Sequence, residues 1–235
     1  MSVDTTDRSD AEELMDDFTM EGEILRDALD KIATINKLLG GNKITLNGVK
    51  ELIKGLSKNT PIHIVDIGCG NGDMLRMIAD DGIKNQYKFS LVGIDANPDA
   101  IKHAQSLTTN YPNITYQCKD IFKSELQNCD IILCTLTLHH FKDAEIRSLL
   151  KLFYQHAKLG MVINDLHRSK VPYYLFKAIC VLFRLNNMSR EDGLVSILRG
   201  FKKQDLLNYS RQLDFKKFSI RWKWAFRYQW IIKST

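Results

Sequence analysis

Few cysteines and no long apolar run mark this 235-residue sequence, and both shortages exclude classes of protein. The five cysteines are odd in number and contain no Cys-x-x-Cys spacing, so they predict neither a disulfide framework nor a zinc site. We expect reduced, mostly buried thiols at Cys69, Cys118, Cys129, Cys134 and Cys180. The longest mainly apolar run spans residues 171–183 and is broken by Lys177, whereas a membrane-spanning helix needs about 20 apolar residues. The sequence therefore predicts no transmembrane helix.

The first 30 residues lack the positive charge of a targeting segment. They hold seven Asp and four Glu against two Arg, opposite in sign to the basic start of a secretory signal or a transit peptide. We therefore expect a cytoplasmic protein. The whole chain is 44% hydrophobic and 26% charged, as in ordinary globular proteins, and its length suits one large domain or one domain with an appendage.

Charge is distributed unevenly along the chain. The first 30 residues carry a net charge of −9, so the remainder carries +14 of the total of +5. Residues 199–235 hold ten Lys or Arg against two Asp, which suits either a polyanionic partner or the acidic N-terminal segment. We favour pairing within the chain.

Residues 1–58 are predicted to form a helical N-terminal cap. Residues 2–10 are polar and expected to fray, whereas residues 13–39 place apolar side chains at helical spacing and predict one or two amphipathic helices. The Gly-Gly-Asn sequence at 40–42 is expected to stop the helix, and residues 46–56 predict another short helix.

Residues 59–235 are predicted to form an α/β domain. Five short apolar runs alternate with helix-like stretches, at residues 63–67, 89–94, 114–117, 131–136 and 161–163. This alternation predicts a doubly wound, Rossmann-like and mostly parallel sheet covered by helices on both faces. Ligands bind such sheets at the carboxyl ends of the strands, so the residues that follow each run are the candidate site.

The C-terminal segment has a different pattern. Aromatic and apolar residues alternate with polar ones from residue 218 to residue 230, which predicts a strand pair turning near residues 222–225. The even-numbered aromatic side chains are expected to form the buried face of this antiparallel hairpin.

A glycine-rich turn follows the first apolar run. Its sequence is Asp66-Ile67-Gly68-Cys69-Gly70-Asn71-Gly72, and a helix is expected over residues 74–79. Glycines permit a tight turn and a close approach of ligand to backbone, and the helix N-terminus offers free N–H groups. An aspartate two places before the first glycine suits a cationic ligand better than a pyrophosphate.

Polar side chains also follow the later runs. Asp95 at the second strand end is able to accept hydrogen bonds from both hydroxyls of a ribose, and Asp120 after the third is able to accept from an exocyclic amine. The fourth run leads through Thr135 into His139-His140, and the fifth into Asp165-Leu166-His167-Arg168.

Together these residues resemble the class I S-adenosylmethionine (SAM)-dependent methyltransferases. Asp66, Gly68, Gly70 and Gly72 match the first motif of that family, and Cys69 lies within it. The resemblance implies a seven-stranded sheet with a C-terminal antiparallel hairpin, and SAM as the cofactor.

The resemblance also implies roles for the later strand ends. Asp95 looks like the ribose-binding acid and Ala96 like the residue that flanks the adenine. Asp120 and Ile121 look like the pair at the adenine edge. Thr135 aligns with the position whose backbone holds the methionine part of the cofactor.

Shorter segments resemble a small-molecule methyltransferase subgroup of mostly uncharacterised bacterial enzymes. These segments are Leu14-Met15-Asp16-Asp17, Ile35-Asn36, Leu39-Gly40-Gly41, residues 165–168 and Arg199-Gly200-Phe201. Residues 167–200 form an unusually long connection rich in aromatic residues, and a helix buried beneath the N-terminal segment is the favoured explanation. A helical insertion that caps the substrate is compatible with it and is also predicted. Contact with a membrane surface is the weakest alternative.

The predicted function is methylation of a small, hydrophobic or aromatic metabolite, on oxygen in the leading hypothesis. A hydroxyl acceptor must lose a proton, and His167 with Asp165 as its orienting partner is the first candidate for the base, followed by His139. We predict no metal, because adjacent histidines point differently and the sequence places no third ligand.

Other activities remain open at this point. They are C- or N-methylation of a quinone-like metabolite, methylation of RNA, and a SAM-binding regulator without turnover. We expect a small-molecule substrate, no nucleic-acid partner and no stable membrane insertion, and we leave a homodimer open.

Overall fold

Short runs of β-branched and other apolar residues form the strands of one sheet in this computed structural model, which describes residues 3–182 and 185–234. In the described part of the chain the sheet has seven strands in the order β3-β2-β1-β4-β5-β7-β6. Their bounds are β1 (Pro61–Ile67), β2 (Lys88–Asp95), β3 (Ile114–Cys118), β4 (Cys129–Thr135), β5 (Ala157–Leu166), β6 (Lys217–Lys223) and β7 (Arg227–Lys233). β7 runs antiparallel to both of its neighbours, and the pairs among β1 to β5 are parallel. The predicted doubly wound sheet with a C-terminal antiparallel hairpin is confirmed.

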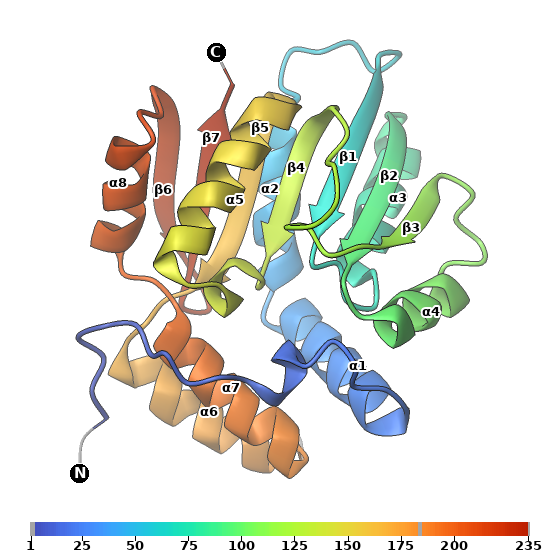
Figure 1. The fold of residues 1–235 in the computed structure, drawn as a ribbon. Helices are drawn as coiled ribbons and strands as arrows, with labels where there is room; N and C mark the ends of the chain where they lie inside the picture. The colour runs from blue at the N-terminus through green and yellow to red at the C-terminus, as the bar shows by residue number, and fades with distance from the viewer. Residues whose placement is uncertain (1–2, 183–184, 235) are drawn as a thin grey trace.

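Helices cover both faces of the sheet and its carboxyl end (Figure 1). Their bounds are α1 (Glu23–Leu38), α2 (Gly41–Leu52), α3 (Asp73–Asn85), α4 (Pro98–Leu107), α5 (Asp143–His156), α6 (Lys170–Leu182), α7 (Asn187–Arg199) and α8 (Lys203–Gln212), with short 3-10 turns at η1 (Leu14–Asp16) and η2 (Leu138–His140). None of these described helices is long and apolar enough to cross a membrane.

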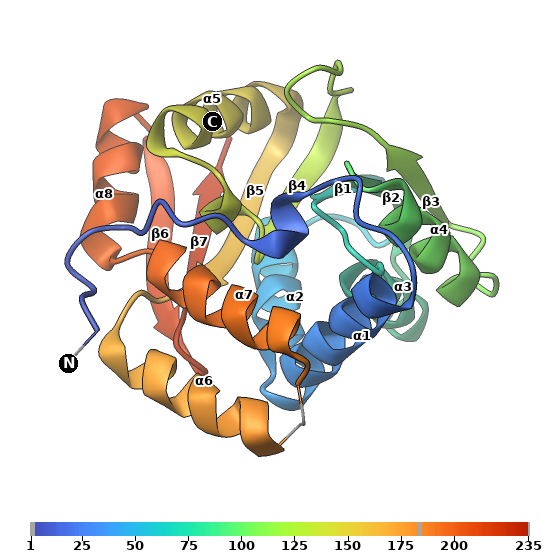
Figure 2. The same cartoon turned by 60° about the horizontal axis from the view of Figure 1, so that its bottom comes forward.

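The core lies in two layers, one on each face of the sheet. One layer centres on Phe153 of α5 and Trp230 of β7, and the other on Ile64 of β1 and Ile78 of α3, all of them fully buried. Burial of each such side chain contributes about 1.5–3 kcal/mol. Both layers leave the carboxyl ends of the strands open toward α1, α6 and α7, as Figure 2 shows.

The N-terminal segment differs from its prediction in several ways. α1 begins only at Glu23, because Gly22 has a positive φ of 89° and residues 14–16 form a separate turn. The break predicted at 40–42 lies at Gly40 in a left-handed conformation, and α2 starts at once at Gly41 rather than at residue 46. α2 then packs on the sheet against β5 and β7.

The expected fraying of residues 2–10 is wrong for residues 3–10, and residue 2 lies outside the described part. Arg8 holds this segment in place. Its guanidinium donates to the carbonyls of Arg199 at 2.8 Å and of His139 and Phe141 at 3.0 Å, and it pairs with Asp143 at 2.7 Å. The segment therefore lies across the carboxyl end of the sheet (Figure 2).

Two predictions about buried aromatic surfaces are partly wrong. The hairpin turns after Lys223, as expected, yet Trp222 on the edge strand β6 is 48% exposed and Trp224 in the turn is 61% exposed. Helix α6 is not buried beneath the N-terminal segment. It packs on α7 and forms the outer layer of the cap, so that only Pro172 and Cys180 are buried among its described residues.

Candidate active site

One large cavity lies between the carboxyl ends of the strands and the cap. Its volume is about 1720 Å³, which exceeds the ~300–1,000 Å³ of most small-molecule sites. Its walls come from the ends of β1, β2, β4 and β5, from the N-terminal segment, and from α1, α6 and α7. This is the edge at which the sequence placed its candidate residues.

The glycine loop shapes the floor of the cavity. Gly68, Gly70 and Gly72 have positive φ values of 69°, 50° and 76°, a conformation that side chains strain. A Cβ atom at Gly68 would lie only 2.3 Å from Thr137. The backbone N–H of Gly70 donates to Asp95 at 3.0 Å, which ties the loop to the end of β2.

Asp66 is a buried carboxylate beside this loop. Its side chain is 2% exposed, and Oδ1 has no hydrogen-bond partner among the described residues. Burial and the nearby charges of Asp73 and Asp95 raise the pKa of Asp66 to about 8. Because an orphaned buried carboxylate is costly, the site favours a cationic ligand that donates to it.

Asp95 and Asp120 line the same cavity but differ in environment. Burial raises the pKa of Asp95, against the hydrogen bonds donated by the backbone of Asn97 and Gly70. Asp120 is more exposed, and hydrogen bonds from the Phe122 backbone and from Lys123 lower its pKa. Ala96 and Ile121 follow these two acids and also line the cavity.

Thr135 ends β4 at the opposite side of the glycine loop. Its carbonyl accepts from the Thr137 hydroxyl at 3.0 Å, and the same hydroxyl reaches the Gly68 carbonyl at 3.3 Å. The Thr135 and Thr45 hydroxyls lie 3.0 Å apart, which links the strand end to α2. Cys69 is a buried thiol whose pKa is raised by burial, so it lines the cavity as an apolar group.

Helix α1 closes over the glycine loop. Asp30 accepts from Asn71 of the loop at 2.8 Å and lies 2.8 Å from His103 of α4. Arg26 pairs with Asp99 of α4 at 3.1 Å. Composition and spacing did not reveal these contacts, because each joins residues more than forty positions apart.

The structure pairs Asp165 with His139 and not with His167. His139 Nδ1 lies 2.7 Å from Asp165 Oδ1, and the backbone N–H of His139 donates to Oδ2 at 3.2 Å. Burial disfavours the charge of Asp165, yet His139 holds the pKa of this carboxyl below its ordinary value. His167 lines the cavity separately, where its Nδ1 accepts from the exposed Trp222 at 3.3 Å, and burial lowers its pKa. The predicted pairing of His167 with Asp165 is therefore not formed.

The N-terminal segment brings two acids to the histidines. Asp16 Oδ1 lies 2.6 Å from His140 Nδ1, and its other oxygen accepts from Arg199 at 2.6 Å. Burial acts against ionisation of Asp16, but these partners hold its pKa well below the ordinary value. Glu13 is 5% exposed, and burial raises its pKa.

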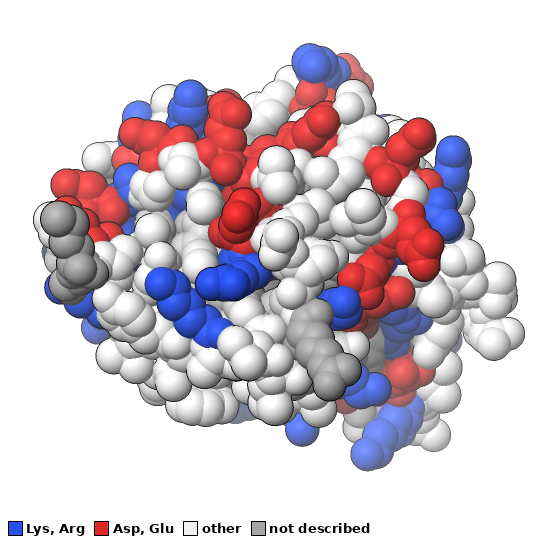
Figure 3. Space-filling view, turned by 90° about the horizontal axis from the view of Figure 1, so that it is seen from below, with Lys and Arg blue, Asp and Glu red and all other residues white. Residues whose placement is uncertain are grey.

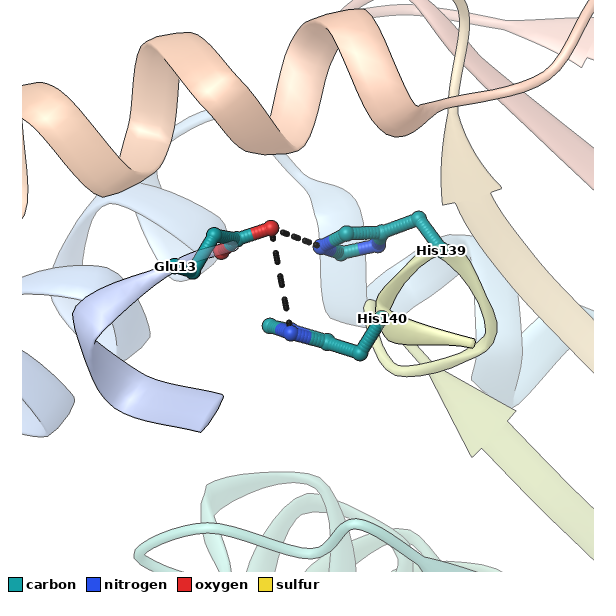
Figure 4. Close-up of side chains that lie close together, drawn as sticks. All are labelled: Glu13, His139 and His140. Atoms are coloured by element: carbon teal, nitrogen blue, oxygen red, sulfur yellow. Dashed lines mark ion pairs between the residues drawn. The ribbon is translucent and has the colours of Figure 1, made fainter. Parts of the chain in front are cut away.

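Figure 4 shows one Glu13 oxygen pointing toward both His139 and His140. We call Glu13, His139 and His140 the histidine–glutamate cluster. Oε1 of Glu13 lies 3.8 Å from Nε2 of His139 and 3.8 Å from Nδ1 of His140. Sequence reasoning placed no third group beside the two histidines. Asp16 and Arg199 lay within the short segments that resemble the small-molecule subgroup, whereas nothing marked Arg8 or Glu13.

Comparisons with known proteins agree with this geometry. Residues 64–160 match the family described as "Methyltransferase domain". The chain is 23% identical over 198 residues to the carboxy-S-adenosyl-L-methionine synthase of Helicobacter pylori strain ATCC 700392 / 26695, covering 80% of this chain and 79% of that protein. It is 31% identical over 86 residues to the ubiquinone biosynthesis O-methyltransferase of Coxiella burnetii strain RSA 493, which is 35% of this chain and about one third (34%) of that protein.

Solved structures with the same fold include two methyltransferases. The plantazolicin methyltransferase BpumL in complex with S-adenosylhomocysteine (SAH) gives a TM-score of 0.67 at 16% identity, covering 88% of this chain and 89% of that chain. Human N-acetylserotonin methyltransferase in complex with SAM gives a TM-score of 0.63 at 16% identity, covering 92% of this chain and 56% of that chain.

The strand order, the glycine loop with its acids and the matching domain define a methyltransferase of the Rossmann-like type. Residues 64–160 carry a methyltransferase domain, and the chain has the fold of SAM-dependent methyltransferases, whose solved structures hold SAM or SAH.

Proposed function

We propose that the protein transfers the methyl group of SAM to an oxygen atom of a small, hydrophobic or aromatic acceptor. The observation that carries this proposal is a single cavity with two unlike ends. One end holds the glycine loop and three carboxylates, and the other holds the histidines beneath apolar side chains of the cap. A volume of about 1720 Å³ has room for a cofactor and an acceptor together.

The cofactor end fits SAM. The orphaned Asp66 oxygen would accept from the ammonium group of the methionine part, with the backbone of Gly68, Cys69, Gly70 and Thr135 beside it. Asp95 would accept from the ribose hydroxyls. Asp120 would accept from the adenine amine, with Ala96 and Ile121 against the ring. When bound, SAM supplies an electrophilic methyl group on a sulfonium.

The acceptor end favours an apolar molecule with one polar group. Pro172, Leu175, Phe176 and Ile179 of α6 line it, together with Ile197 of α7. Phe176 is the aromatic side chain that α6 contributes, while Tyr173 and Tyr174 contact Lys177 instead. The protein's work in methyl transfer is alignment and exclusion of water, and alignment is worth up to roughly 7–11 kcal/mol.

The histidine–glutamate cluster supports oxygen as the acceptor atom. A hydroxyl must lose its proton, and the cluster is the place in this cavity where imidazole and carboxylate groups converge. Asp165 fixes the orientation of His139 there. The role of His167 as the base stays a prediction, and so does the role of His139, which the contact with Asp165 now makes the first candidate.

Methylation of RNA is a weaker proposal. Acidic and basic side chains are intermixed on the face that carries the cap (Figure 3), whereas a nucleic-acid site needs a basic track. Arg199 of the C-terminal segment pairs with Asp16, as expected from the opposite charges of the two chain ends.

The test begins with calorimetric titration of the purified protein with SAM, SAH and NAD. We expect SAM and SAH to bind and NAD not to bind. The loaded enzyme is then incubated with a panel of phenols, catechols, quinols, amines and short RNAs, and products are identified by mass spectrometry. Methyl ethers support the proposal. Methylation of carbon, nitrogen or RNA alone would replace it, and SAM binding without turnover would favour a regulator.

A further inference from the structure

The histidine–glutamate cluster contains two buried atoms that lack a partner in the described structure. They are Oε1 of Glu13 and Nε2 of His139, which face each other at 3.8 Å. Both side chains are 3% exposed, and neither atom has a hydrogen-bond partner among the described residues. A missing partner at such a point is costly unless something binds there.

Neighbouring groups of α7 orient the Glu13 carboxylate toward the histidines. Ser196 donates to the other Glu13 oxygen at 2.6 Å, which leaves Oε1 directed at the histidines. The backbone N–H groups of Leu14 and Met15 donate to Asp192 at 2.8 and 3.0 Å, and this contact positions the segment that carries Glu13. Two residues of α7 therefore set the position of the unpartnered oxygen: Ser196 through the Glu13 side chain and Asp192 through the backbone beside it.

His139 has the arrangement of a metal-binding histidine. Its Nδ1 lies against Asp165 at 2.7 Å, which favours the proton on Nδ1 and the lone pair on Nε2. A carboxylate behind the imidazole is the usual second layer of such ligands, because it fixes the tautomer and the ring orientation.

The distances suit one ion. Atoms 3.8 Å apart can both lie about 2.1 Å from a zinc ion, which is the ordinary length of Zn–N and Zn–O bonds. His140 completes the set with Nδ1 at 3.8 Å from the same Glu13 oxygen, and its ring centroid lies 4.2 Å from that of His139. An ion at Nδ1 would replace the contact of His140 with Asp16, which retains its pair with Arg199.

The local charge favours a divalent cation. The cluster contains the carboxylate of Glu13, and three more carboxylates lie close to it, those of Asp16, Asp165 and Asp192. The opposing guanidinium of Arg199 lies 2.6 Å from Asp16 and 3.7 Å from Glu13. Arg8 is paired elsewhere, with Asp143. The buried Arg227 also lies near Asp165. Two guanidinium groups against four carboxylates still leave negative charge that a divalent ion would balance.

We propose that Glu13, His139 and His140 bind a divalent transition-metal cation of the zinc type. Two imidazole nitrogens and one carboxylate oxygen are a ligand set that leaves a fourth position open. This inference rests on the proposed function in one respect, because the open position would hold the acceptor oxygen. An ion bound there would lower the pKa of the acceptor hydroxyl, whose proton would pass to water. The oxygen would then form a bond to the methyl carbon with its own electron pair, while the sulfur–methyl bond of SAM breaks and SAH leaves. The prediction of no metal from sequence is thereby revised.

The test uses the full-length protein after treatment with a chelator and dialysis. Zn²⁺ binding is measured by calorimetry and Co²⁺ binding by visible absorption. We expect one ion per chain and tetrahedral cobalt bands. Glu13→Gln and His140→Gln should each weaken Zn²⁺ binding about 100-fold, and Asp165→Asn about 10- to 100-fold through the orientation of His139.

A matched control is the partly exposed His156 at the end of α5, whose Nδ1 lies 3.0 Å from Asn128 Oδ1 and which does not line the cavity. His156→Gln should leave Zn²⁺ affinity unchanged. SAH titration reports whether each variant is folded, and His140→Gln at the half-buried position keeps the test decisive if Glu13→Gln does not fold. Absence of stoichiometric binding, or equal binding by wild type and both ligand variants, would overturn the site. Zn²⁺ binding without SAH binding would instead refute the proposed function and leave the metal site standing.

Discussion

The cofactor end and the acceptor end of the cavity are built in different ways. The cofactor end is local: Asp66 and the three glycines lie within seven residues, and Asp95 lies one strand further on. The acceptor end joins Glu13 and Asp16 to His139, His140 and Arg199, which are more than 120 residues away along the chain. Local motifs can be read from one sequence, whereas a site assembled over such distances becomes visible only in the fold.

Gly68→Ala should produce the largest effect and confine it to the cofactor end. The new Cβ would meet Thr137 at 2.3 Å in a backbone conformation with φ of 69°. We expect SAH affinity to fall at least about 100-fold, since strain and clash together exceed ~2.8 kcal/mol. Calorimetry with SAH measures it. The control is Gly55→Ala. Gly55 also has a positive φ, of 92°, but a Cβ atom there would have no described atom within 4 Å. This variant should lose only ~1 kcal/mol of stability and bind SAH normally.

Asp16→Asn should produce a smaller effect, at the acceptor end. It keeps the shape of the side chain but removes the charge that holds Arg199 and His140, a contact worth about 1.5–3 kcal/mol. We expect turnover to fall roughly 10- to 100-fold while SAH affinity changes less than about threefold. The neighbouring Asp17→Asn is the control and should behave as wild type, because its exposed side chain bonds to Thr19 and the described structure gives it no contact with Arg199 or His140. A parallel loss of SAH binding would contradict the separation of the two ends.

The pH dependence of cofactor binding should give the smallest effect, at Asp66. With a pKa of about 8 this carboxyl is mostly protonated at neutral pH, and an ammonium ligand binds its ionised form. SAH affinity should therefore rise roughly tenfold between pH 7 and pH 8.5, with release of close to one proton at pH 7. Calorimetry in buffers of different ionisation enthalpy counts the proton. Asp66→Asn should remove both the proton release and the pH dependence.

Asp66 also affects stability, in the opposite direction. A carboxyl whose folded pKa is raised above its unfolded value contributes stability below the unfolded pKa, and this contribution is lost as pH rises toward about 8. Thermal unfolding without ligand should thus show wild type losing stability relative to Asp66→Asn from about pH 4 to pH 8. An unchanged difference across that range would mean that Asp66 is ionised in the free protein.

Much of the fold was predictable because its signals are local. The apolar runs gave β1 to β5 within a few residues, and the period-two alternation gave the β6–β7 hairpin. Helix starts were less predictable. Gly41 looks like a helix breaker in the sequence, yet it is the first residue of α2. A Cβ atom at this position would meet Asn36 and Arg227, so glycine permits a close packing that only the tertiary fold reveals.

The cofactor end of the site was predictable from the sequence, whereas the contacts of the acceptor end were not. Asp66, Asp95 and Thr135 lie in the last two residues of their strands and Asp120 follows β3, and the structure brings them to one cavity. The partner of Asp165 was not predictable, because nearness in sequence suggested His167 while the strand places Asp165 opposite η2 and His139. Whether these side chains perform their predicted roles awaits the experiments above.

The contact of Asp16 with Arg199 spans 183 positions of the chain. During synthesis the N-terminal segment leaves the ribosome first, yet its partner in α7 is among the last parts to be made. The acceptor end therefore closes late in biogenesis, and a fusion partner attached to the N-terminus would compete with that closure more than one attached to the C-terminus.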